Sequence, residues 1–226
     1  MSRLYIVSTP IGNLDDFTIR GLETFRTVDV IACEDTRRTL KLLNHHGIRK
    51  RLISCRAATE EAAAGKVIAL LNEGKEVAFA SDAGAPGLSD PGSVLVSLVR
   101  DGGHEVVPIP GPSAVTTLAS VAGIRGKGFF FEGFLSPRAG RRRKRIEELV
   151  SMDESFILFE SPFRFVKLMA DLADICPERP VIVGREMTKI HEEYIEGTCS
   201  SVYESVLART EIKGEICLLV GGKKKH

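Results

Sequence analysis

EVAFASDAGAPGLSDPG, residues 76–92, joins a short apolar run to a long turn that is rich in glycine and proline. The run from Glu76 to Ala80 has the length and continuous hydrophobicity of a strand that is buried on both faces. The residues from Ser81 to Gly92 favour a loop, because glycine and proline interrupt any regular pattern. Ser93 to Arg100 then has helical spacing. A buried strand, a loop and a helix in this order are typical of an α/β fold.

The rest of the N-terminal half repeats this alternation of strands and helices. The other predicted strands are Leu4 to Ser8, Val28 to Cys33, Arg51 to Cys55 and Glu105 to Ile109. The other predicted helices are Thr18 to Thr27, a helix capped by Asp35, Thr59 to Leu71 and Ser113 to Val121. Apolar strands separated by helices predict a mostly parallel sheet with helices on both faces. Ligands bind such sheets beyond the C-terminal ends of the strands.

The second half has more closely spaced strands, which predicts a mixed sheet. We expect its strands at Phe129 to Phe131, Ser155 to Phe159, Val181 to Arg185, His191 to Glu196 and Glu215 to Val220. The turn-rich segment from Gly123 to Lys127 is the expected boundary. The predicted fold is therefore two α/β domains, residues 1–123 with a mostly parallel sheet and residues 124–226 with a mixed sheet.

The composition excludes several classes of protein. The 226 residues are 43% hydrophobic with a net charge of +1, so any nucleic-acid-binding surface must be local. No apolar run is long enough for a membrane span, and Met1 to Val7 enters a strand pattern without a secretory leader. The five cysteines form no C-x-x-C pair, and the five histidines are not spaced as metal ligands, so we expect no metal site. We expect the cysteines to be reduced thiols, which fits a cytoplasmic location.

Three segments rich in glycine and proline follow predicted strands. They are residues 8–14, 81–92 and 108–114, and all three should lie at the same edge of the sheet. Neither a phosphate-binding loop nor a G-x-G-x-x-G sequence is present, which disfavours a nucleoside triphosphate. A nucleoside with an amino-acid tail, held by backbone groups, fits better. Each loop alone could instead be an ordinary tight turn.

Charged residues gather beside these loops and at four other places. Residues 34–37 and 16–20 should line the mouth of the site, although Asp35 could serve only as a helix cap. Residues 138–145 contain six basic side chains, which favours a phosphate-contacting patch over a solvated helix face. The lysines at 223–225 could add to this patch or form a frayed tail. Residues 160–164 and 185–193 follow further strands and could be salt-bridged surface.

Seven ordered motifs resemble the tetrapyrrole methylase superfamily, and within it the enzymes that methylate the RNA of the small ribosomal subunit. They are TPIGNL (9–14), EDTR (34–37), SDAGAPGLSDPG (81–92), PGPSA (110–114), GFL (133–135), ESPFR (160–164) and REMTKIHE (185–192). The resemblance runs from about residue 4 to residue 221, almost the whole chain.

This resemblance implies a homodimer that uses S-adenosylmethionine, bound in the cleft between the two domains. It also implies 2′-O-methylation of a cytidine ribose in the decoding region of 16S rRNA, with the assembled 30S subunit as substrate. The cofactor site would consist of Pro10, Ile11, Asp82, Ala83, Gly84, Ala85, Ser113, Ala114, Phe159 and Glu160.

A ribose hydroxyl is a weak nucleophile, so a nearby base or cation should assist the transfer. We expect Lys189 or Glu34 to have this role, with Asp35 and Arg37 placing the nucleotide. The expected RNA-binding residues are Arg20, Arg37, Arg141, Arg142, Arg143 and Lys144.

The chain departs from the family pattern in two places. Residues 54–60 replace a histidine-rich segment, which puts the substrate contacts of that loop in doubt. The family often continues into a small helical extension, where this chain ends in three lysines and His226.

Three other activities stay open at this stage. One is methylation of a tetrapyrrole, which would not need six basic residues at one helix end. The second is RNA binding by a module with an inactive cofactor pocket. The third is protein methylation of the diphthine synthase type.

Overall fold

The computed structural model describes residues 2–123 and 128–223. The chain divides into two compact units, Met1–Ser113 and Ala114–His226. The division therefore precedes the boundary expected at residue 123, because helix α5 (Ala114–Val121) packs against a strand of the second unit. Residues 124–127 of the predicted boundary segment lie outside the described residues.

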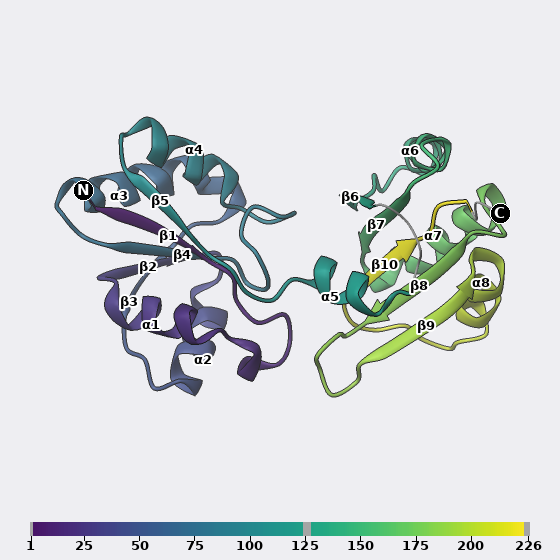
Figure 1. The fold of residues 1–226 in the computed structure, drawn as a ribbon, viewed down its shortest axis with the longest axis horizontal. Helices are drawn as coiled ribbons and strands as arrows, with labels where there is room; N and C mark the ends of the chain where they lie inside the picture. The colour runs from purple at the N-terminus through teal and green to yellow at the C-terminus, as the bar shows by residue number, and fades with distance from the viewer. Residues whose placement is uncertain (1, 124–127, 224–226) are drawn as a thin grey trace. The chain divides into compact units, whose positions relative to one another are not determined.

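The first unit contains a five-stranded parallel sheet (Figure 1). In spatial order its strands are β3 (Arg51–Ser54), β2 (Val30–Cys33), β4 (Val77–Ala80), β1 (Arg3–Val7) and β5 (Glu105–Ile109). Residues of β2 and β4 are buried throughout, as expected for strands covered on both faces. The predicted parallel sheet is confirmed.

Helices cover both faces of this sheet. Figure 1 shows α3 (Glu60–Asn72) and α4 (Ser93–Asp101) on one face, and α1 (Ile19–Thr27) and α2 (Thr36–His45) on the other. Two separate apolar clusters lie beneath these helix pairs. Short 3₁₀ turns at Leu14–Asp16 and Ala57–Thr59 precede α1 and α3. The strand order places the C-terminal ends of β1, β4, β2 and β5 along one edge.

The second unit contains a mixed five-stranded sheet, as predicted. In spatial order its strands are β6 (Phe129–Phe134), β7 (Ser155–Glu160), β10 (Ile216–Val220), β8 (Pro180–Arg185) and β9 (Glu193–Thr198). Strands β6 and β7 are parallel, whereas β10 is antiparallel to both β7 and β8. Consequently β6, β7 and β8 all run in the same direction. The strand expected from His191 starts at Glu193, because residues 189–192 form a turn in which Glu192 N donates to Lys189 O.

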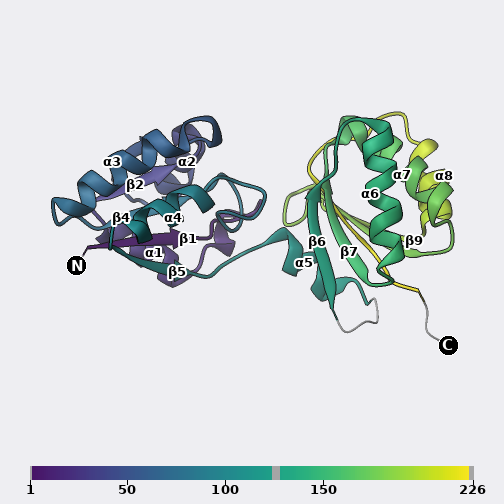
Figure 2. The same cartoon turned by 90° about the horizontal axis from the view of Figure 1, so that it is seen from above.

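Three helices lie on one face of the second sheet (Figure 2). They are α6 (Ala139–Ser151), α7 (Pro162–Ile175) and α8 (Cys199–Leu207). Their inward residues, such as Ile146, Phe165 and Val202, pack with Phe156 and Leu218 of the sheet in one core. All five cysteines are buried and free, as expected. None of the helices in the described part of the chain combines the length and hydropathy needed to span a bilayer.

Candidate functional site

The loops after β1 and β4 are joined by backbone hydrogen bonds. Thr9 N donates to Gly84 O at 2.9 Å, and Gly84 N donates to Thr9 O at 3.0 Å. The Thr9 hydroxyl also donates to Ser81 O at 3.2 Å. Because these bonds fix both loops just beyond their strands, the predicted residues Pro10 and Ile11 are held beside Gly84.

The loop after β5 meets the other two at the same place. Gly84 has a φ of +77°, and a Cβ there would lie 3.5 Å from Ile11 Cγ2 and 3.8 Å from Pro112 O. A Cβ at Gly111 would lie 3.0 Å from Ser8 Cβ, tighter than most side chains tolerate. The three predicted loops of the first unit therefore converge, and two glycines permit their close approach.

Asp82 connects this cluster of loops with the start of α2. Its Oδ1 atom accepts a hydrogen bond from Asp35 N at 2.9 Å, and its Oδ2 atom lies 3.5 Å from Arg38 Nε. Ala83 and Ala85, on either side of Gly84, are half-buried, as is Ser113. The sequence alone does not indicate a role for Arg38, since its pairing with Asp82 depends on β2 and β4 being neighbours.

Glu34 and Asp35 have opposite electrostatic environments. Burial, followed by repulsion from the Asp82 carboxylate, raises the pKa of Glu34. Hydrogen bonds from the side chain and backbone of Arg37 lower the pKa of Asp35. Asp35 accepts the bond from Arg37 N that caps α2 and pairs with the Arg37 guanidinium at 2.6 Å. The capping interpretation of Asp35 is thus confirmed, and Glu34 is the carboxyl group whose proton affinity is increased.

Glu60 anchors the far end of the long loop. Its side chain is buried, and Oε1 accepts bonds from Gly92 N at 2.8 Å and Leu95 N at 3.0 Å. Helix α4 has no side-chain cap of its own at Gly92, so Glu60 of α3 supplies it. Nothing in the local sequence indicates this role of Glu60, because its partners are more than thirty residues away.

In the second unit, Phe159 and Glu160 end β7. Phe159 is half-buried and packs edge-on against Phe131 and Phe134, with centroids 5.1 and 5.6 Å apart. Glu160 is buried, pairs with Arg164 at 2.6 Å and accepts a bond from Ser161 N at 2.7 Å. The other predicted residue of this unit, Ala114, begins α5 and is half-buried.

Lys189 is a paired cation. Its Nζ atom lies 2.8 Å from Glu186 Oε1 and 3.0 Å from Glu215 Oε2. Burial alone would lower the pKa of Lys189, but the hydrogen bonds to these two carboxylates outweigh it, so the pKa is raised. Lys189 therefore remains charged near neutral pH.

The structure corrects the predicted basic patch. Arg142 is buried and pairs with Asp171 at 2.7 Å, so it cannot contact RNA. Arg143 also pairs with Asp171, at 3.0 Å, and with Asp174. Asp171 and Asp174 belong to α7, so the ion pairs of these two arginines connect α6 with α7.

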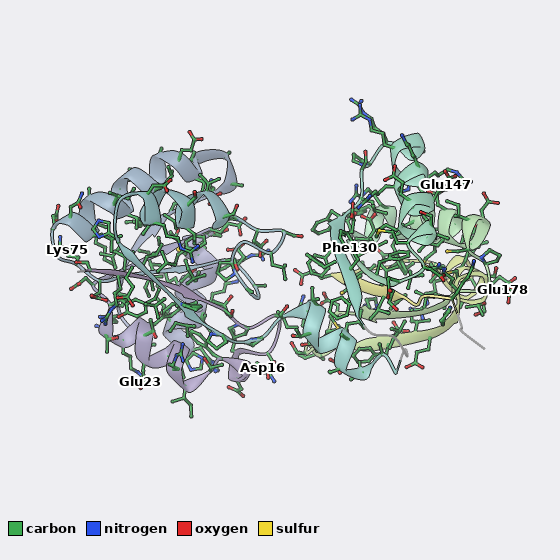
Figure 3. The ribbon with its side chains drawn as sticks, turned by 45° about the horizontal axis from the view of Figure 1, so that its top comes forward. Asp16, Glu23, Lys75, Phe130, Glu147 and Glu178 are labelled. Atoms are coloured by element: carbon green, nitrogen blue, oxygen red, sulfur yellow. The ribbon has the colours of Figure 1, made fainter. Side chains whose placement is uncertain are left out.

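The other basic side chains have different surroundings. Arg145 pairs with Glu132 and Glu148, and its guanidinium lies over the ring of Phe130, 5.8 Å from the ring centroid. Figure 3 labels Phe130 among the side chains of the second unit. The exposed cations of the segment are Arg138, Arg141 and Lys144, which form no ion pair within the described residues.

The two predicted RNA contacts of the first unit are both at its surface. Arg37 is exposed, and Arg20 donates from Nη2 to Pro108 O at 2.7 Å. Lys224 and Lys225 lie outside the described residues. In the part of the chain that the structure describes, no group of three or more His, Cys, Asp or Glu side chains is placed to hold a metal ion.

The sequence matches the family model for tetrapyrrole (corrin/porphyrin) methylases over residues 3–203. The chain belongs to the tetrapyrrole methylase family. The resemblance inferred from the sequence is thus confirmed.

Curated relatives match almost the whole of this chain. It is 44% identical to ribosomal RNA small subunit methyltransferase I of Borrelia garinii subsp. bavariensis, covering 96% of this chain and 97% of the relative. It is also 44% identical to the protein of that name from Thermotoga maritima, covering 99% and 100%. The Bacillus subtilis protein of that name is 41% identical, with 100% of this chain and 77% of the relative covered.

Solved structures agree on the fold. A diphthine synthase structure superposes with a TM-score of 0.77 at 17% identity, covering 100% of this methylase and 92% of that chain. A cobalt precorrin-4 methyltransferase gives a TM-score of 0.71 at 18% identity, covering 97% and 94%. At such low identity these neighbours establish the architecture and leave the substrate undecided.

Proposed function

We propose that this methylase transfers a methyl group from S-adenosylmethionine to the 2′-hydroxyl of a cytidine ribose in the decoding region of 16S rRNA. The 30S subunit is the proposed substrate, and the protein acts as a homodimer in the cytoplasm. Full-length similarity to proteins named ribosomal RNA small subunit methyltransferase I carries this proposal. The convergence of three loops in the first unit supports it.

The loop cluster fits a nucleoside with an amino-acid tail. Ala83 and Ala85 offer half-buried apolar surface on either side of Gly84, whose own N–H and C=O groups are bonded to Thr9. Asp82 offers a carboxylate to hydroxyl or amino groups. Pro10, Ile11, Asp82, Ala83, Gly84, Ala85 and Ser113 would hold the cofactor, and Ala114, Phe159 and Glu160 are the corresponding proposals in the second unit. The cofactor would supply an electrophilic methyl group on a sulfonium.

Glu34 and Lys189 have complementary proposed roles. The pKa of Glu34 is shifted upward, toward neutral pH. A general base accepts the hydroxyl proton more effectively when its pKa is closer to the working pH. Lys189 stays protonated and would stabilise the oxyanion that develops as this proton leaves. Asp35 and Arg37 would place the nucleotide, with Arg37 presenting its exposed guanidinium to a phosphate.

The test is transfer of labelled methyl from S-adenosylmethionine to 30S subunits, followed by mass mapping of the modified nucleotide. Glu34→Gln and Lys189→Met should each lower kcat about 100-fold or more, as expected for loss of a general base or of an oxyanion-stabilising group. Calorimetry should show unchanged affinity for S-adenosylmethionine. Glu61→Gln and Lys66→Met, at exposed positions of α3, are the matched controls.

Three results would contradict parts of this proposal. Near-normal turnover of both variants would remove Glu34 and Lys189 from the mechanism. Transfer to uroporphyrinogen and none to 30S subunits would identify a tetrapyrrole as the substrate. An absence of S-adenosylmethionine binding would favour a non-catalytic RNA-binding module.

A further inference from the structure

Three connections of the second unit lie along one edge of its sheet. They follow β6, β7 and β8, the strands that run in the same direction. The register aligns their ends, since Phe134 is opposite Phe159, and Ile216 of β10 is opposite both Glu160 and Arg185. Arg164 after β7 donates from Nη1 to Leu135 O after β6 at 3.4 Å. With strands about 4.8 Å apart, the row from β6 to β8 spans roughly 15 Å.

One large apolar side chain is exposed at each of these places, at the last residue of β6 and in the connections after β7 and β8. Phe134 is 54% exposed, Phe163 is 92% exposed and Ile190 is 97% exposed. We call these three residues the apolar edge. Phe163 and Ile190 are the most exposed large apolar side chains described in this unit, and neither belongs to its core. Packing within the unit therefore does not explain why apolar side chains occupy these two positions.

Two cations near the apolar edge have no ion-pair partner among the described residues. Arg138 and Arg141 follow Phe134 at the start of α6, both are exposed, and neither forms an ion pair within the described residues. The nearby carboxylates are engaged, because Glu160 pairs with Arg164, while Glu186 and Glu215 pair with Lys189. Glu192 accepts hydrogen bonds from Thr188 N and Tyr194 Oη.

We infer that the apolar edge binds unstacked bases of a single-stranded RNA segment, while Arg138 and Arg141 contact its phosphates. This inference rests on the proposed function and adds the means by which the substrate is recognised. Exposed rings stack on bases of any sequence, and side chains such as Ile190 cover apolar base surface. Phosphates of the RNA backbone would neutralise the unpaired Arg138 and Arg141.

The test uses the full-length protein and a fluorescein-labelled single-stranded RNA 12-mer that contains cytidines, with binding measured by anisotropy across a salt series. Phe163→Ala should weaken binding about five- to tenfold, the lower range for base stacking. Ile190→Ala should weaken it by a smaller factor, because an aliphatic side chain covers a base without stacking on it. Phe163→Tyr should retain the affinity and Phe163→Leu should not, because stacking needs the ring. Leu207→Ala, at an exposed apolar position of α8, is the matched control and should bind normally.

Salt dependence separates the two kinds of contact. The double variant Arg138→Ala/Arg141→Ala should reduce the slope of log K against log salt by about 1.4, because two phosphate contacts are lost. The variants at Phe163 and Ile190 should leave this slope unchanged. In methyl transfer to 30S subunits they should raise KM and leave kcat and S-adenosylmethionine affinity near normal.

Unchanged RNA affinity in both Phe163→Ala and Ile190→Ala would overturn the inference. So would a change of these variants from dimer to monomer in analytical ultracentrifugation with no loss of RNA binding, which would make the edge an interface between copies. Failure of the unaltered protein to methylate 30S subunits would refute the proposed function alone, since the anisotropy measurement still tests the edge.

Discussion

Replacing Glu60 by alanine should release the C-terminal end of the long loop, residues 81–92. In the native protein one carboxyl oxygen satisfies two backbone N–H groups, those of Gly92 and Leu95, in a buried site. A hydrogen bond accepted by a charged group contributes roughly 1.5–3 kcal/mol, so the lower value for both bonds gives about 3 kcal/mol. Since about 1.4 kcal/mol corresponds to a factor of ten, local opening should become about 150-fold more frequent.

The measurement is hydrogen exchange of the Gly92 and Leu95 amides, which reports local opening directly. Both amides should exchange about 150-fold faster in Glu60→Ala, and by an intermediate factor in Glu60→Gln, which keeps one acceptor oxygen and loses the charge. Because the same loop contains Asp82 and Gly84, affinity for S-adenosylmethionine should fall several-fold. Glu61→Ala, at the exposed neighbouring position, is the control.

Two outcomes would refute this reasoning. If the two amides exchange at the native rate in Glu60→Ala, other acceptors replace the Glu60 carboxylate without a loss of local stability. Equally accelerated exchange throughout the first unit would mean that Glu60 stabilises the whole unit and not this loop.

Two further predictions concern the second unit. Hydrogen bonds from Arg209 and then Arg185 lower the pKa of Glu193 to about 2 from its ordinary 4.5, so its contribution to stability is present above pH 4.5 and is lost as the pH falls toward 2. Glu193→Gln should remove that part of the acid dependence in thermal unfolding, and an unchanged acid profile would contradict it. Arg142→Ala should lower the free energy of unfolding in urea by about 3 kcal/mol, because it breaks a buried ion pair, whereas Arg141→Ala should change it by less than about 0.5 kcal/mol. Equal effects of the two arginine variants would contradict the separation of structural from exposed arginines.

The parallel sheet of the first unit was predictable because each strand is a continuous apolar run followed by turn residues. Fully buried strands such as β2 and β4 need apolar side chains on both faces, and that requirement is visible locally. The three loops were predictable for the same reason, since strands that are parallel must end at one edge. The boundary between the units was placed too late, because α5 has the same helical pattern whichever sheet it packs on.

The basic segment shows where local patterns fail. Arg141 and Arg142 are adjacent and chemically identical, yet Arg141 is exposed and Arg142 is buried against Asp171. In the sequence both are simply positive charges, because Asp171, the partner of Arg142, lies 29 residues further along the chain. Lys189 is a similar case, because Glu215 approaches it only through pairing of β8 with β10.

By itself the sequence determined the order of strands and helices, the glycine- and proline-rich loops and the family to which the chain belongs. These depend on short-range periodicity and on motifs that are contiguous in the chain. The tertiary structure alone decided which charges are neutralised, which carboxyl group caps α4 and which apolar side chains remain in solvent at the ends of β6, β7 and β8. Each of those outcomes depends on a partner brought close by strand pairing or helix packing, and no local pattern of residues encodes that partner.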